Sequence, residues 1–151
     1  LEEVRKASAA EKNLVVSPAG VRTAEYLQQT FGTPWEVWSP PLNPALQEKL
    51  RTLSARKILV VHQQFTANAV RREIRKNSSV EIVAASWFMM LDPWKEANDV
   101  QLTDEAQFAE LVQQGGFDAV IGDLKLKRVL RNFSGEFIDL PHFAVSGRLE
   151  E

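Results

Sequence analysis

The two histidines of this chain are the side chains best suited to chemistry, and each follows a predicted strand. His62 comes directly after the apolar run 58–61, and His142 comes shortly after a predicted strand at residues 137–140. An imidazole can bind a ligand or a metal, and it can exchange a proton near neutral pH. Two histidines without a matching carboxylate spacing are a weak metal signal, so we assign no metal ligand. The alternative is that each histidine only forms a hydrogen bond in a loop.

Polar residues near other predicted strand ends complete the set of candidate ligand-binding residues. The set is Ser17, Gly20, His62, Gln63, Gln64, Asn68, Asp123 and His142. Ser17 and Gly20 begin a predicted helix whose free N–H groups could hold an anion, but simple helix capping is the favoured interpretation. Asp123 is also interpreted as a helix cap, and a carboxylate acting on substrate is the alternative.

The sequence assigns no catalytic residue. It contains neither the GxGxxG dinucleotide fingerprint nor the GxxxxGK[ST] phosphate loop, and no Ser-His-Asp or Cys-His triad can be assembled. The segment 87–91 is unusually apolar for a long connection, and Asp92, Pro93 and Trp94 follow it. Such a segment either packs in the core or forms an interface or the wall of a cofactor cavity.

Short apolar runs alternate with amphipathic segments, which predicts an α/β fold. Strands are predicted at residues 13–16, 35–38, 58–61, 80–85, 119–121 and 137–140, and helix N-caps at Ser17, Asn43, Thr66, Thr103 and Asp123. The run 58–61 lacks polar alternation, which is typical of a parallel strand buried on both faces. The repeated β-α order predicts a three-layer, Rossmann-like open parallel sheet with helices on both faces. Ligands bind beyond the carboxyl ends of such strands, where the candidates fall.

Length and composition narrow the class of protein. The 151 residues correspond to one domain, with a possible hinge near residues 39–43. The net charge of -2 argues against a nucleic-acid binder, and no apolar run approaches the ~20 residues that span a bilayer. We therefore expect a cytoplasmic protein with no nucleic-acid or membrane partner. The absence of cysteine excludes disulfides and any thiolate-bound metal within this chain.

Several segments, in their order and spacing, resemble nitrogenase component 1-type oxidoreductases. They are residues 13–20, 24–34, 57–71, 116–128 and 141–147. Residues 24–34 resemble the family's Ala-x-x-Leu…Phe-Gly-Ile-Pro segment, although Thr33 replaces the isoleucine. Residues 116–128 resemble the family's Gly-Tyr-Asp-Val-Ile-Ile-Gly-Asp…Leu-x-Arg unit. The resemblance covers most of the chain from Asn13 onward.

This resemblance implies that the chain is a fragment of a larger reductase subunit built from several Rossmann-like domains. The family includes nitrogenase molybdenum-iron protein subunits, their cofactor-assembly scaffolds and the dark-operative protochlorophyllide reductase. Its members hold iron–sulfur clusters through cysteines and receive electrons from an ATP-dependent iron protein. The implied partners are the remaining domains of the parent chain, a homologous subunit in a homo- or hetero-oligomer, and that iron-protein reductase.

Two departures from the family shape the expected function. Without cysteine the chain can contribute no family cluster ligand, so an iron–sulfur or related cluster would be held elsewhere in the parent protein. His62 stands where relatives often have glycine, which would place an imidazole in an inter-domain cavity. We expect one wall of a metal-cluster or substrate cavity in an oxidoreductase, inactive as an isolated fragment. The alternatives are a non-catalytic cofactor-assembly scaffold and an unrelated small-molecule-binding Rossmann-like module.

Overall fold

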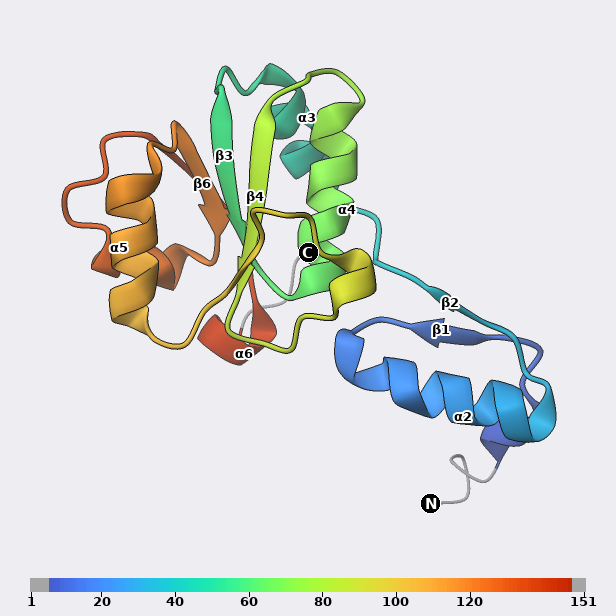
Figure 1. Ribbon diagram of the computed structural model, residues 1–151. Helices are drawn as coiled ribbons and strands as arrows, with labels where there is room; N and C mark the ends of the chain where they lie inside the picture. Colours follow the sequence, from blue (N-terminus) through green and yellow to red (C-terminus); the bar gives the residue numbers. More distant parts are fainter. Residues whose placement is uncertain (1–5, 148–151) are drawn as a thin grey trace.

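Five parallel strands form the main sheet of the computed structural model, which describes residues 6–147 (Figure 1). In spatial order they are β5 (Val100–Gln101), β4 (Glu81–Ser86), β3 (Lys57–Val61), β6 (Ala119–Gly122) and β7 (Glu136–Asp139). The central strand β3 pairs with β4 on one side and with β6 on the other. Its residues 58–61 are at most 2% exposed, as the lack of polar alternation predicts. The predicted Rossmann-like α/β fold is confirmed.

Helices cover both faces of the main sheet. On one face, α3 (Pro44–Thr52) and α4 (Gln64–Arg75) pack on alternate strand residues that include Ile58 and Val60. On the other face, α5 (Glu105–Gly115) and the 3-10 helix η4 (Leu124–Val129) pack on the intervening residues, which include Leu59 and Val61. Among residues 6–147, no helix is long and apolar enough to cross a membrane.

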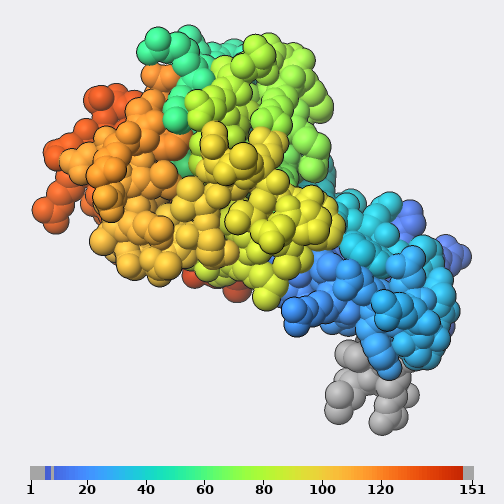
Figure 2. Space-filling view, viewed as in Figure 1, coloured from blue at the N-terminus to red at the C-terminus, as the bar shows by residue number. Residues whose placement is uncertain are grey.

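The first part of the chain forms a separate lobe, which we call the first lobe (residues 6–37). It contains η1 (Lys6–Ala9), β1 (Asn13–Val15), η2 (Pro18–Gly20), α2 (Val21–Phe31) and β2 (Trp35–Val37). Strands β1 and β2 pair in parallel only with each other, so these two predicted strands do not join the main sheet. The first lobe projects from the body, and Figures 1 and 2 show it meeting the segment that follows β4. Trp35 of the first lobe and Trp94 of that segment contact each other with ring centroids 6.4 Å apart.

Two of the predicted helix caps are wrong. Helix α4 begins at Gln64 and its N-cap is Gln63, so Thr66 already lies in the first turn. Helix α5 is capped by Asp104 rather than by Thr103. In both cases another polar side chain close to the predicted cap satisfies the free N–H groups, which the sequence pattern alone does not resolve.

The caps predicted at Asn43 and Asp123 are confirmed. Asn43 Oδ1 accepts from the main-chain N–H of Leu46 at 2.8 Å, and Asp123 Oδ1 accepts from that of Lys125 at 2.9 Å. The helix after Asp123 is of the 3-10 type, and the short helix α6 (Phe143–Ser146) follows β7. These turns place Asp123 and His142 next to each other at the carboxyl edge of the sheet.

Candidate functional site

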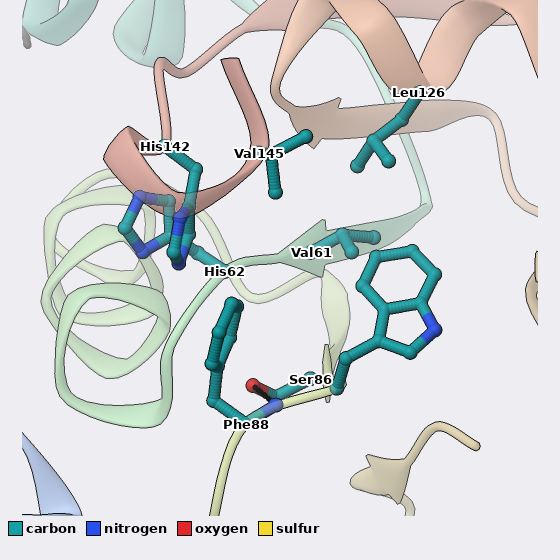
Figure 3. A pocket seen from close by; sticks show the side chains of 8 residues that line it. Val61, His62, Ser86, Phe88, Leu126, His142 and Val145 are labelled. Carbon is teal, nitrogen blue, oxygen red and sulfur yellow. Dashed lines mark hydrogen bonds between the residues drawn. The ribbon is translucent and has the colours of Figure 1, made fainter. Parts of the chain in front are cut away.

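The carboxyl edge of the main sheet gathers polar and aromatic side chains from four strand ends. His62 follows β3, Ser86 ends β4, Asp123 follows β6 and His142 comes after β7. Parallel strands place their carboxyl ends at one edge, which is where open α/β sheets bind ligands. Figure 3 shows the His62 and His142 rings side by side with the Phe88 ring close to them. This group of residues is the candidate site.

The hydrogen bonding of His62 sets the position of its proton. Its Nε2 lies 3.1 Å from the carbonyl oxygen of Pro141. A carbonyl oxygen can only accept, so Nε2 carries the hydrogen and donates it. Nδ1 of His62 then carries a lone pair. This nitrogen is buried and has no hydrogen-bond partner in the part of the chain that the structure describes.

A main-chain donor determines which ring nitrogen of His142 carries the hydrogen. The N–H of Ala144 donates to His142 Nδ1 at 3.2 Å, so Nδ1 keeps its lone pair. In the neutral ring the hydrogen then lies on Nε2. That N–H group is also buried and has no partner within residues 6–147. His62 therefore offers an unpaired acceptor and His142 an unpaired donor.

Both unpaired nitrogens belong to one aromatic stack. The ring centroids of His62 and His142 lie 4.2 Å apart with 42° between the planes. Phe88 stacks on the His142 ring at 4.6 Å and 8°. Both histidines also line one small cavity.

Both imidazoles are uncharged near neutral pH. Burial, together with the smaller effect of the neighbouring His142, lowers the pKa of His62 to about 4, against the opposing effects of the Pro141 hydrogen bond and of Asp123. Burial also lowers the pKa of His142. Desolvation disfavours the charged form of a histidine, which explains both directions.

The buried carboxylate of Asp123 positions His142. It is 0% exposed, and its Oδ2 accepts from the main-chain N–H of His142 at 2.9 Å and from the hydroxyl of Ser146. Its Oδ1 caps η4 through Lys125. Asp123 thus joins the end of β6 to the segment after β7. It caps η4, as predicted, and it also holds His142 in position.

A small cavity lies at the histidines, and a larger groove adjoins it. The cavity has a volume of about 10 Å³ and is lined by Val61, His62, Ser86, Trp87, Phe88, Leu126, His142 and Val145. That is close to the smallest space that holds one water molecule. The open groove has a volume of about 320 Å³ and shares Trp87, Phe88, Leu126 and Val145 with the cavity. The other lining residues of the groove are Asp104 and Glu105.

A larger hollow lies at the opposite edge of the sheet. It has a volume of about 430 Å³ and lies between α5 and the segment 129–134. Its polar lining residues Gln113, Arg131, Asn132 and Ser134 are not buried. Buried, unpaired polar groups are the feature that sets the histidine cavity apart from this hollow.

Gln63, Gln64 and Asn68 hold neighbouring segments in place. Gln63 Nε2 donates to the carbonyl oxygen of Val16 in the first lobe at 3.0 Å. Gln64 is fully buried, and its amide forms two 2.9 Å hydrogen bonds with the main chain of Leu91. Asn68 Nδ2 donates to the carbonyl oxygen of Trp94 at 2.9 Å. Gln64 and Asn68 therefore fix the loop 87–99, which carries Phe88.

Ser17 and Gly20 lie in the first lobe, at the carboxyl end of β1. Ser17 precedes η2 in an extended conformation, and its side chain makes no cap hydrogen bond. Gly20 precedes α2, and a Cβ atom there would lie 3.3 Å from the Val15 side chain. The structure thus brings His62, Asp123 and His142 together and leaves Ser17 and Gly20 in the first lobe, between β1 and α2.

The donors at this site do not fit an iron–sulfur or other metal cluster. The chain has no cysteine, and among residues 6–147 no group of three or more His, Asp and Glu side chains could hold a metal. The hydrogen bonds that fix the two tautomers leave one lone pair, on His62 Nδ1. A cluster needs several thiolate or imidazole lone pairs directed at it.

Phe88, Leu126 and Val145 line the cavity but are absent from the set of predicted site residues. The apolar segment 87–91 gave a signal, because such residues are unusual in a long connection. Leu126 and Val145 have no such signal, since an apolar residue at a helix position is ordinary core material.

Comparison with known proteins adds no family assignment. A scan against protein-family models finds no match, and a search of curated proteins also finds none.

Proposed function

We propose that this chain is a domain of a nitrogenase component 1-like oxidoreductase, and that its carboxyl edge forms one wall of the substrate cavity. The observation that carries the proposal is the pair of buried, unpaired imidazole nitrogens on His62 and His142. An unpaired buried polar group destabilises a fold, so its presence at a ligand-binding edge favours a functional role.

The chemistry that these residues can supply is substrate binding and proton handling. His62 Nδ1 can accept a hydrogen bond or a proton, and His142 Nε2–H can donate one. Phe88 and the groove beside it can shield the reacting group from water. Any electron-transfer cluster would be bound by cysteines outside this chain, and electrons would come from an ATP-dependent iron protein.

The first test is a metal analysis of the full-length protein purified without oxygen. Iron and sulfide together with charge-transfer absorption in the visible range support the proposal. A colourless, iron-free protein that reconstitution does not change contradicts it.

A second test uses His62→Ala in the same protein. We expect a loss of turnover in a protein that still folds. The unfolding temperature should fall modestly, because alanine also removes the hydrogen bond to Pro141 and the contact with the His142 ring. Gln113→Ala, at the hollow on the opposite edge, is the matched control and should retain full turnover. Equal activity of the two variants would remove His62 from the site.

A second candidate is a small-molecule-binding module that has the Rossmann-like fold but no cluster chemistry, as in a non-catalytic scaffold. One observation favours it: both unpaired nitrogens and the adjoining groove belong to this single chain. The metal analysis separates the two candidates. An iron-free protein that still binds a ligand at the histidines would support the binding module and contradict the oxidoreductase.

A further inference from the structure

The groove beside the histidines has an apolar floor and an acidic rim. Trp87, Phe88, Leu126 and Val145 provide most of its lining, and Asp104 and Glu105 provide its charged groups. Arg128 lies near it and forms an ion pair with Glu105 at 3.0 Å. With two carboxylates at the groove and a buried carboxylate on Asp123, this edge disfavours anionic ligands.

The inner end of the site selects an uncharged polar group. His62 Nδ1 requires a donor and His142 Nε2–H requires an acceptor. An anion supplies acceptors only, and a metal ion needs lone pairs on both nitrogens. A hydroxyl supplies a donor and an acceptor on one oxygen, and a primary amide or a lactam supplies them on the nitrogen and oxygen bonded to one carbonyl carbon.

We propose that the cavity and the groove together bind an uncharged, largely apolar molecule that ends in an amide or lactam. The carbonyl of the ligand accepts from His142 Nε2–H, and its N–H donates to His62 Nδ1. The apolar body lies along Trp87, Leu126 and Val145 in the groove. This inference rests on the same site as the proposed function and names the class of its substrate.

Phe88 controls access to this site. The cavity holds little more than one water molecule, so a lactam enters only when the stacked Phe88 ring moves away from His142. Phe88 is 37% exposed and lies at the start of the loop 87–99, so its ring can turn toward solvent.

The test uses full-length protein labelled with ¹⁵N at histidine and the lactam 2-quinolone as the probe. We expect saturable shifts of the His62 Nδ1 and His142 Nε2 resonances. N-methyl-2-quinolone, which lacks the N–H donor, should bind about tenfold more weakly or worse, because His62 Nδ1 stays unpaired. Phe88→Ala should bind 2-quinolone up to about tenfold more tightly, since no stacked ring has to be displaced. Met89→Ala is the matched control and should bind like the native protein.

Three results would overturn the inference. The first is no saturable shift with 2-quinolone in either the native protein or Phe88→Ala. The second is equal binding of 2-quinolone and its N-methyl derivative. The third is a saturable shift of both nitrogens by Zn²⁺ or inorganic phosphate at lower concentration, which would identify a metal or anion site. The readout is independent of iron content and turnover, so a protein without a cluster can still pass this test.

Discussion

Two buried polar clusters in this protein are built in opposite ways. In the first, Arg71 is 3% exposed and bonds to Asn68 at 2.9 Å and to the carboxylate of Asp99. Asp99 in turn accepts 2.8 Å hydrogen bonds from the main-chain N–H groups of Ala84 and Glu96. Within residues 6–147, only Nε of the Arg71 guanidinium lacks a partner. In the second cluster, His62 and His142 each leave a buried nitrogen unpaired.

The difference separates a structural role from a functional one. The Arg71–Asp99 cluster ties the end of the loop 87–99 to α4 and to β4, and its charges are largely neutralised within the chain. The histidine pair is anchored only through one nitrogen of each ring. Arg71 Nε and Asn13 Nδ2 are also buried without a partner in residues 6–147. It is the position of the two histidine nitrogens at the carboxyl edge of the sheet that favours a partner from outside the chain.

The largest expected effect tests the structural half of this comparison. Asp99→Ala leaves the Arg71 guanidinium buried without its main partner and also removes acceptors from two main-chain N–H groups. We expect the free energy of unfolding to fall by about 3–5 kcal/mol in urea titration. Arg75→Ala, which removes an ion pair between two half-exposed side chains, is the control and should change it by less than about 1 kcal/mol. If the free energy of unfolding falls by less than about 1 kcal/mol in both variants, the Arg71–Asp99 cluster does not stabilise the fold and the contrast with the histidine pair fails.

The next effect is a dependence of stability on pH that comes from His62. Its pKa is about 4 in the folded chain and 6.5 without burial, so below pH 6.5 the unfolded state binds a proton that the folded state does not. Stability should therefore fall as the pH decreases from about 6.5 to about 4, by about 3 kcal/mol. Urea titrations across this range should show a smaller slope for His62→Gln. Identical slopes in the two proteins would mean that His62 is not desolvated.

The smallest effect is expected for His62→Gln at pH 7.5. Glutamine keeps an N–H that can donate to the Pro141 carbonyl and removes only the unpaired Nδ1. We expect a change in the free energy of unfolding of less than about 1 kcal/mol, measured by urea titration. A loss as large as that of Asp99→Ala would make the histidine pair a structural element and reverse the comparison.

The sequence predicted six of the seven strands that the structure describes, but neither the short strand β5 nor the division into two sheets. The buried runs at β3 and β6 lack polar alternation, and this pattern identifies parallel core strands. The run at β1 has the same character, yet it pairs only with β2. In this run Leu14 and Val16 are 52% and 51% exposed, so an apolar run establishes neither burial nor the neighbouring strand, and the first lobe could not be separated on this basis.

The site was predictable in its position but not in its chemistry. His62 and His142 follow strands, and parallel strands bring such residues to one edge. Their tautomers depend on Pro141 and Ala144 main-chain atoms, whose directions come from the tertiary fold. The position of Phe88 depends on the loop 87–99, which Gln64 and Asn68 hold from a different element. These distant contacts leave no local pattern.

The two hydrogen bonds that fix the tautomers share one origin, because both partners are main-chain atoms of residues 141–144. Main-chain atoms are the same whichever side chains surround them. The backbone of these residues therefore determines that His62 offers the acceptor and His142 the donor. Substitutions in the groove can change its lining without reversing this assignment. A ligand that carries its own donor and acceptor can then bind in one orientation but not the other, so the site distinguishes the two ends of a substrate before any catalytic group acts on it.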